Sequence, residues 1–181
     1  MNDDLPVLRG ALVTLRWARH TDVDARFALG RDPGIIEMYG VDPQALPPFT
    51  RAAAEAWVQR LLDHPCAWVI EYEGSPIGEA RLDNIDREER RASFAIGIAD
   101  AALLGKGLGT EAARLVLAQA FDTLNLHRIS VRVMAHNHRA IRSYEKCGFR
   151  VEGRERETVF LSGEWMDDVI MGLLDREFVR A

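Results

Sequence analysis

Three glycines alternate with other residues in the run Leu104-Gly105-Lys106-Gly107-Leu108-Gly109-Thr110. The residues before this run, 93–98, favour a strand, and the alanine-rich residues after it favour a helix. Glycines at every second position leave a row of backbone N–H groups with no side chains in front of them. Such groups at the start of a helix bind phosphate. The spacing therefore predicts a site for a phosphate or a pyrophosphate.

The spacing also separates the kinds of phosphate site that use glycine-rich turns. A P-loop is excluded, because Asp100 stands where that motif has its first glycine and Gly107 stands where it has Ser or Thr. The match to a dinucleotide-binding fingerprint is weak, because Thr110 stands where that motif has its third small residue. That fingerprint also needs an acidic residue where Val133 and Met134 stand. A flexible turn without a ligand remains an alternative interpretation.

A second segment lies one predicted strand further along the chain. It runs from Asn137 to Phe149 with the spacing Asn-x-x-Ala-x-x-x-Tyr-x-x-x-Gly-Phe. Together with the glycine run, it resembles the acetyl-CoA site of the GNAT superfamily of N-acetyltransferases, and the resemblance covers residues 8–175. Residues 163–171 resemble the branch that includes ribosomal-protein N-terminal and spermidine acetyltransferases. Leu104 departs from the family, which often has Arg or Gln there.

The resemblance implies that acetyl-CoA is the co-substrate and that no metal is used. In the family, the strand before the glycine turn splays from its neighbour, and Ala95 and Gly97 give that strand a nearly bare face. The cofactor-binding residues that the resemblance implies are Ile96, Gly97, Ile98, Gly105, Lys106, Gly107, Leu108, Gly109, Thr110, Asn137, Ala140, Ser143 and Tyr144. Lys106 is equally well explained as a solvated lysine, and a helix-capping role alone explains Asn137.

The implied chemistry is the attack of an amine on a thioester. A free alkyl ammonium has a pKa of about 10, so a base must remove its proton before it can attack. The family places an oxyanion donor at the backbone N–H near Ile98 and an acid at Tyr144, which could otherwise be a core aromatic. Strand alternation makes Glu79 the first candidate base, and Asp83 and Glu37 are the alternatives.

The elements that position these residues predict a mixed α/β domain. Strands are expected at 12–17, 67–72, 76–82, 91–98, 128–134, 149–161 and 164–174. Helices are expected after an N-cap at Thr21, after a cap at Thr50 as far as Leu62, over 108–124, and from a cap at Asn137 to Cys147. Residues 31–49 predict a loop-rich excursion. This order indicates a mostly antiparallel central sheet flanked by helices, with a βαβ unit over 91–134. The resemblance adds splayed strands that form the acetyl-CoA cleft.

Composition limits the class of protein. The chain has 181 residues, of which 48% are hydrophobic and 28% charged, so we expect one domain over 1–181. Its net charge of −5 argues against nucleic-acid binding. No apolar run is long enough to cross a membrane. With only Cys66 and Cys147 as thiols, a reducing, cytoplasmic location is expected. Dimerisation follows from the resemblance alone.

The main hypothesis is therefore an enzyme that moves an acetyl group from acetyl-CoA to a primary amine. The acceptor could be a protein N-terminus, a polyamine or another small amine. A non-catalytic acyl-CoA-binding or sensing module on the same fold is the alternative. A nucleotide-dependent oxidoreductase is a third possibility. His136 and His138 form a His-x-His pair, but the sequence near them offers no further metal ligands.

Overall fold

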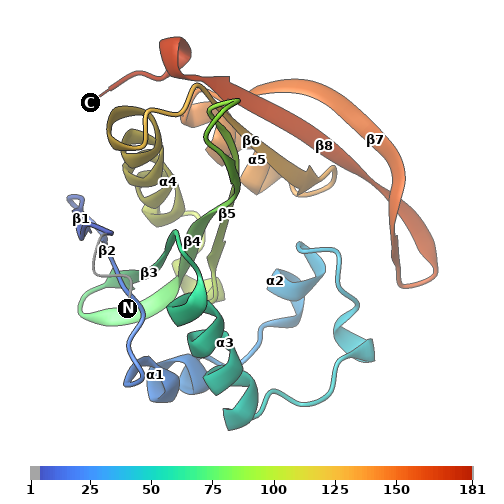
Figure 1. Cartoon of the computed structure of the whole chain (residues 1–181). Coiled ribbons are helices and arrows are strands. Elements are labelled where there is room, and N and C mark those ends of the chain that lie inside the picture. Colours follow the sequence, from blue (N-terminus) through green and yellow to red (C-terminus); the bar gives the residue numbers. More distant parts are fainter. Residues whose placement is uncertain (1–4, 181) are drawn as a thin grey trace. The chain divides into compact units, whose positions relative to one another are not determined.

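The computed structural model describes residues 5–180. The strands form one sheet in the order β1-β2-β3-β4-β5-β6-β8-β7, and Figure 1 labels the elements. The strands are β1 (Leu8–Arg9), β2 (Thr14–Arg16), β3 (Ala67–Tyr72), β4 (Ser75–Asp86), β5 (Arg91–Ile98), β6 (Arg128–Met134), β7 (Arg150–Leu161) and β8 (Glu164–Leu174). The helices are α1 (Asp22–Leu29), α2 (Pro33–Glu37), α3 (Arg51–Asp63), α4 (Leu108–Ala118) and α5 (His138–Lys146).

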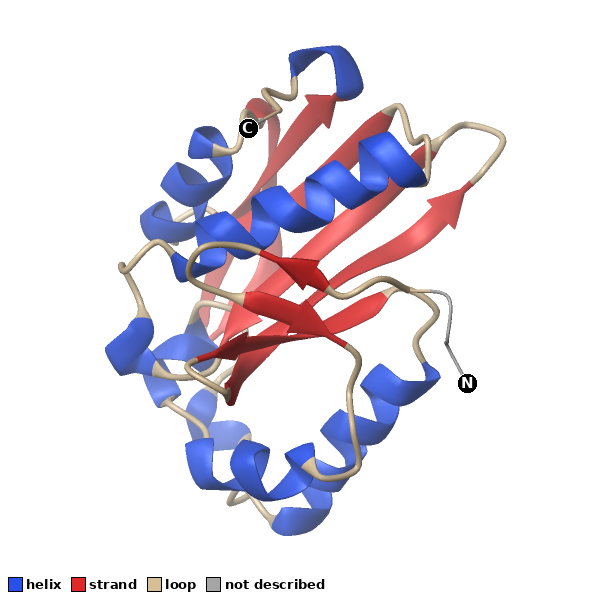
Figure 2. Cartoon of the chain, turned by 90° about the vertical axis from the view of Figure 1, so that its left-hand side faces the viewer, coloured by secondary structure: helices blue, strands red, loops and turns tan. Residues whose placement is uncertain are grey.

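The pairing of the strands confirms the predicted mixed sheet. β5 pairs with β6 in parallel, whereas the pairs β1–β2, β2–β3, β3–β4, β6–β8 and β7–β8 are antiparallel. Figure 2 shows the strands in red and the helices in blue. The parallel pair is the one that α4 connects, as expected for a βαβ unit.

The chain divides into two compact units, and unit 1 comprises residues up to Asp32, 48–82 and 95–116. Leu15 of β2 lies opposite Ile70 of β3, and neither side chain is exposed. Helices α1 and α3 pack on each other through Val23, Ala54 and Val58. Burial of these apolar side chains supplies the main stabilisation of the unit.

A buried ion network joins β2, α1 and β3 in unit 1. Arg16 is only 7% exposed, and it pairs with Asp22 at 2.8 Å and with Glu71 at 2.5 Å. The Oδ2 atom of Asp22 also accepts a hydrogen bond from the Arg19 N–H at 2.8 Å. Thr21 was predicted to cap α1, but its side chain makes no capping bond. Thr21 does occupy the predicted N-cap position, but the adjacent carboxylate of Asp22 accepts from the backbone before the helix instead.

Unit 2 comprises residues 33–47, 83–94 and 117–181. β6 pairs with β8 along its whole length, from Arg128 opposite Leu174 to Met134 opposite Asp168. β8 also pairs with β7, and these two strands form the long ribbon drawn in orange and red in Figure 1. The α4 helix continues into a π-helical turn at Gln119–Thr123, so the helical segment reaches the predicted end.

Several predicted boundaries match closely, and two are corrected. β5, β6 and β8 have the predicted bounds, and residues 33–45 contain only short helices, as expected of a loop-rich excursion. The strand predicted over 12–17 is shorter in the structure, where β2 covers Thr14–Arg16. β4 extends to Asp86, beyond the predicted end of that strand at residue 82. Asp86 accepts hydrogen bonds from the N–H groups of Glu88 and Glu89, which places the turn after Asp86.

Candidate functional site

The predicted phosphate-binding turn lies in unit 1, between β5 and α4. Gly105 has a φ of +80° and Gly107 a φ of +85°, backbone conformations that favour glycine. Among the described residues, nothing lies within 4 Å of a Cβ built on either glycine. α4 begins at Leu108, and the first N–H groups of a helix have no partner within it. The turn therefore presents backbone donors and the positive end of a helix dipole to an anion.

The end of β5 lies beside this turn. A Cβ built on Gly109 would lie 3.8 Å from Cγ1 of Ile98, so the third glycine of the turn contacts the last residue of the strand. On its other side, β5 approaches β4 closely, because a Cβ on Gly78 would lie 2.0 Å from the carbonyl oxygen of Gly97. The Ala99 N–H donates to the Ile77 carbonyl at 2.8 Å. Unit 1 thus brings together the predicted contacts at Gly97, Ile98 and the glycine turn.

Asn137 begins α5 in unit 2. Its Oδ1 accepts a hydrogen bond from the Ala140 N–H at 3.1 Å, which confirms the predicted helix cap. Its Nδ2 donates to the carbonyl of Met38 at 3.5 Å, so the same side chain also holds the segment after α2. Gly148 follows the helix with a φ of +99°, a left-handed conformation that favours glycine at this C′ position. Both polar atoms of the Asn137 side chain therefore have a structural partner.

Tyr144 lies in the same helix, and its side chain is buried. The residue is 7% exposed, and its ring meets Phe94 at 6.3 Å and Phe149 at 5.5 Å between centroids, in edge-to-face arrangements. Burial raises the pKa of the Tyr144 hydroxyl well above its ordinary value, and Tyr39 and Cys147 act in the same direction. The phenol therefore keeps its proton at neutral pH. Tyr144 therefore packs in the core through its ring and also carries a proton on its hydroxyl.

Glu79 lies on β4 with both carboxylate oxygens engaged. Arg60 donates to the two oxygens at 3.1 and 3.0 Å, and Arg81 donates to Oε1 at 2.5 Å. The Glu79 side chain is 12% exposed. A carboxylate that accepts from two guanidinium groups must release one of them before it can take a proton from an amine. The geometry thus favours an ion-pairing role for Glu79, and its role as base stays a prediction.

The other candidate bases are Glu37 and Asp83, and the histidine pair is the only candidate for a metal site that the sequence raised. Glu37 is exposed in α2, and Asp83 is half-buried in β4. Within residues 5–180, no group of three or more His, Cys, Asp or Glu side chains is arranged to hold a metal ion. In the same range, no helix is both long and apolar enough to cross a membrane. Cys147 is buried directly after α5 and Cys66 directly before β3, and neither forms a disulfide within the described residues.

Glu111 is a residue whose role the sequence did not reveal. Its carboxylate accepts three backbone N–H groups, from Ala11, Leu12 and Val13, at 2.8–2.9 Å. A Cβ on Gly10 would lie 2.6 Å from that carboxylate, so glycine leaves it room. These bonds fix the turn between β1 and β2 to the first turn of α4, directly after the glycine run. The only feature of the sequence that pointed to Glu111 was its position as an acidic residue near the start of a predicted helix.

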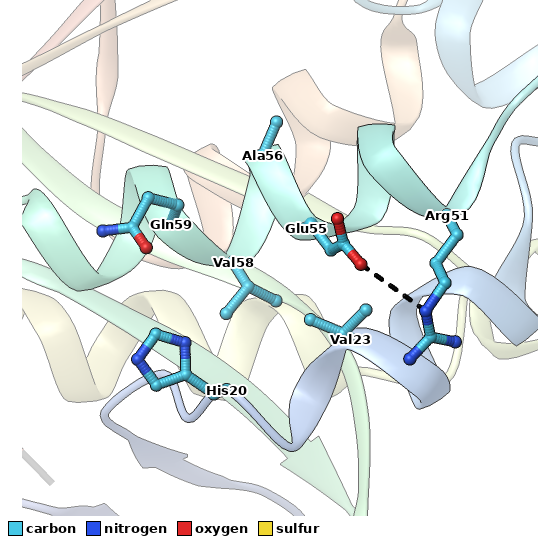
Figure 3. Close-up of a pocket in the computed structure, with 7 residues that line it drawn as sticks. All are labelled: His20, Val23, Arg51, Glu55, Ala56, Val58 and Gln59. Atoms are coloured by element: carbon cyan, nitrogen blue, oxygen red, sulfur yellow. Dashed lines mark ion pairs between the residues drawn. The ribbon is translucent and has the colours of Figure 1, made fainter.

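A surface pocket in unit 1 lies between α1 and α3, and Figure 3 shows its lining. It contains none of the predicted site residues. Arg51 and Glu55 form an ion pair across one turn of α3, with 3.5 Å between Nε and Oε1. The residues that line it are His20, Val23, Arg51, Glu55, Ala56, Val58 and Gln59.

Comparisons with known proteins agree with this geometry. Residues 13–150 match the family model described as acetyltransferase (GNAT) domain. A spermidine N(1)-acetyltransferase of Escherichia coli (strain K12) is 34% identical over 112 residues, which is 62% of this chain and 60% of that protein. The probable N-acetyltransferase YjcK of Bacillus subtilis (strain 168) is 40% identical over 99 residues, 55% of each chain. The matched regions thus span about 60% or less of these two relatives.

The fold comparison covers more of the chain. The crystal structure of spermidine N-acetyltransferase from Vibrio cholerae in complex with CoA and spermine superposes with a TM-score of 0.78. It is 26% identical, and the match covers 94% of this chain and 100% of that one. The sheet and the connections described above are therefore those of a known fold.

Proposed function

This chain belongs to the acetyltransferase (GNAT) domain family, and we propose that it transfers an acetyl group from acetyl-CoA to a primary amine. The observation that carries the proposal is the turn in which Gly105 and Gly107 open the backbone in front of the start of α4. Acetyl-CoA carries a pyrophosphate, and an open row of N–H groups at a helix N-terminus suits that group. The residues present therefore fit this co-substrate.

The proposed contacts fall into two groups, one in each unit. In unit 1, the end of β5 would meet the pantetheine arm and the glycine turn would bind the pyrophosphate, with Lys106 adding an exposed positive charge. In unit 2, α5 would contribute its first turn and Tyr144. The residues included in this proposal are Ile96, Gly97, Ile98, Gly105, Lys106, Gly107, Leu108, Gly109, Thr110, Asn137, Ala140, Ser143 and Tyr144. At Leu104 the contact of the polar side chain frequent in the family would be missing or supplied by a backbone group.

The chain's own residues would serve three steps. Acetyl-CoA supplies a thioester whose carbonyl carbon an amine can attack. The backbone N–H near Ile98 would stabilise the developing oxyanion, and Tyr144 would donate a proton to the departing thiolate. The Tyr144 hydroxyl holds its proton at neutral pH, as a general acid must, although burial raises its pKa and so makes it a weaker acid than an ordinary phenol. A carboxylate would accept the proton of the ammonium, with Glu79, Asp83 and Glu37 as the candidates.

The proposed acceptor is a small-molecule or peptide amine. A polyamine is one candidate, because two of the similar proteins are named spermidine acetyltransferases. We further propose that residues 1–181 act as one N-acetyltransferase domain in the cytoplasm and that the chain forms a homodimer. Family membership supports these points, and size-exclusion chromatography with light scattering tests the dimer.

The release of free thiol from acetyl-CoA tests the proposed activity. The full chain is incubated with acetyl-CoA and a panel of amines and N-terminal peptides, and binding of CoA is measured in parallel by calorimetry. Acceptor-dependent thiol release supports the enzyme. Tight CoA binding without release for any acceptor would favour an acyl-CoA-binding or sensing module. Binding of NAD without binding of CoA would overturn the proposal in favour of a nucleotide-dependent enzyme.

A further inference from the structure

Two arginine side chains, Arg60 and Arg81, pair with Glu79 in unit 1. Arg60 of α3 donates to Glu79 through both terminal nitrogens, and Arg81 of β4 donates through one. The Arg60 side chain is 48% exposed, so much of it faces solvent. A guanidinium carries five N–H donors in a planar fork. Arg60 thus keeps donors beyond the two that reach Glu79.

Arg26 of α1 is close enough to Glu79 and Arg60 for their charges to act on it, and it lies beside two aromatic rings. The carbon atom at the centre of its guanidinium, Cζ, lies 4.3 Å from the ring centre of Phe49 and 5.5 Å from that of Trp57. Its Nη1 donates to the carbonyl of Gly30 at 2.7 Å. Its Nε is buried and has no hydrogen-bond partner among residues 5–180. A buried donor of this kind calls for an acceptor, because an unsatisfied buried N–H is costly.

The charges that act on Arg26 are mostly of its own sign. Burial lowers the pKa of the Arg26 guanidinium, Glu79 opposes that shift, and Arg31 and Arg60 reinforce it. Arg31 also lies over the Phe49 ring, with Cζ 5.0 Å from the ring centre. Among these charges, that of Glu79 has the largest effect on Arg26. The unpartnered Nε of Arg26 and the exposed part of the Arg60 guanidinium together offer N–H donors to a planar anion that can accept several of them.

We propose that Arg26, Arg60 and Arg81 bind a carboxylate of the acceptor, so that the acceptor is an amine that also carries an acid, as a free amino acid does. This inference rests on the proposed acetyl transfer. Glu79 holds Arg60 and Arg81 in place as a positioning residue. It directly follows Gly78, where β4 meets β5 at Gly97, the segment proposed for the pantetheine arm. We name the residues Arg26, Arg60, Arg81 and Glu79 the arginine cluster.

The arginine cluster also predicts which acceptors bind poorly. A polyamine carries several positive charges and no anion, and guanidinium groups repel it. Attaching a carboxylate beside the amine converts that repulsion into attraction. Because a charge-assisted hydrogen bond to a buried partner changes affinity by about tenfold or more, the discrimination is large enough to measure.

Matched pairs of acceptors test the inference directly. Each amino acid is compared with the amine that remains when its carboxylate is removed: ornithine with 1,4-diaminobutane, lysine with 1,5-diaminopentane, and phenylalanine with phenethylamine. The kcat/KM of each is measured by thiol release with wild-type protein. We expect the acid to exceed its amine by about tenfold in at least one pair. Preference for the amine in every pair overturns the inference.

Variants of the cluster then assign the preference to these residues. Arg60→Gln is expected to raise the KM of the preferred acid by about tenfold with little change in kcat, and to leave the KM of the paired amine unchanged or lower. Arg60→Lys should recover part of the loss, since it keeps the charge. Arg26→Gln should act in the same direction. Arg51→Gln is the matched control, because Arg51 lies on the same helix and pairs with Asp24 and Glu55.

The outcomes separate this inference from the proposed activity. If acetyl-CoA is not bound, the proposed function itself fails. If amines are acetylated but Arg60→Gln and Arg51→Gln change the acid-to-amine ratio equally, only the carboxylate inference fails. Thermal unfolding in the presence of CoA gives a readout without turnover. The preferred amino acid should raise the Tm of wild type more than that of Arg60→Gln, and an equal rise contradicts the inference.

Discussion

Gly78 and Gly97 come so close that no side chain fits between them: a Cβ on Gly78 would lie 2.0 Å from the carbonyl oxygen of Gly97. The Ala99 N–H, two residues beyond Gly97, donates to the Ile77 carbonyl. β4 therefore fixes the backbone at the end of β5, which leads towards the glycine run. Any change at Gly78 must move one of the two strands.

Gly78→Ala is expected to destabilise the fold and to weaken CoA binding. Overpacking of this kind costs about 1–3 kcal/mol in the free energy of unfolding. Denaturant unfolding measures that cost, and calorimetry with CoA measures the binding. Gly153→Ala is the control, because a Cβ there meets nothing within 4 Å among the described residues and needs no unusual φ. Equal stability of the two variants would contradict the close approach.

Tyr144→Phe separates the acid role of Tyr144 from its packing role. The variant keeps a ring against Phe94 and Phe149, so the free energy of unfolding should change little. If Tyr144 is the acid, kcat should fall by about 10²–10⁴-fold while the affinity for CoA is retained. Because burial raises the pKa of Tyr144, wild-type activity should not decline in mildly alkaline buffer through loss of this proton. Full activity of the variant removes Tyr144 as an essential acid.

The segments predicted most accurately from sequence were those whose signals are local. Asn137 caps a helix three residues from its partner Ala140, and Gly148 ends that helix through its own φ. The hairpin of β3 and β4 turns at Glu73 and Gly74, both with positive φ. Such features depend on neighbours in the chain, so residue type alone indicates them.

The contacts that sequence reasoning missed join distant parts of the chain. Glu111 binds backbone groups about 100 positions earlier, and nothing near it in sequence signals this. Strand alternation placed Glu79 on one face of β4. It could not indicate that Arg60, which lies on α3 and 19 residues earlier in the sequence, would donate to both oxygens of the Glu79 carboxylate. The candidate base was therefore identified by type and face, without knowledge of its partners.

Glu79→Gln tests the two roles that remain for that carboxylate. As an ion-pair residue, its loss leaves Arg60 and Arg81 without their anion, so thermal stability should fall. The acidic limb of the pH–rate profile should then persist, because a different group accepts the proton. Glu55→Gln, in an exposed pair with Arg51, is the control for the loss of a carboxylate. A fall in kcat of about 100-fold or more together with loss of the acidic limb would instead identify Glu79 as the base.

Glu152 provides a pH-dependent contribution to stability in unit 2. Both its carboxylate oxygens accept from Arg128, and a Cβ on Gly172 would lie 2.3 Å from Oε1, so glycine at 172 leaves room for the pair. The hydrogen bonds from Arg128 lower the pKa of Glu152 below its ordinary value of 4.5. A carboxyl with a lowered pKa in the folded state stabilises the fold above its unfolded pKa, and the effect is lost as the pH falls through the folded value.

Glu152→Gln should therefore lower the Tm at pH 7, and the difference from wild type should shrink as the pH falls below the ordinary value of 4.5. Thermal melts across the acidic range measure this difference. The exposed Glu145→Gln on α5 is the control, and its Tm difference should stay small at every pH. Gly172→Ala should reproduce the loss at pH 7, since the added Cβ displaces the carboxylate from Arg128. A Tm difference for Glu152→Gln that stays constant with pH would show that the ion pair does not set it.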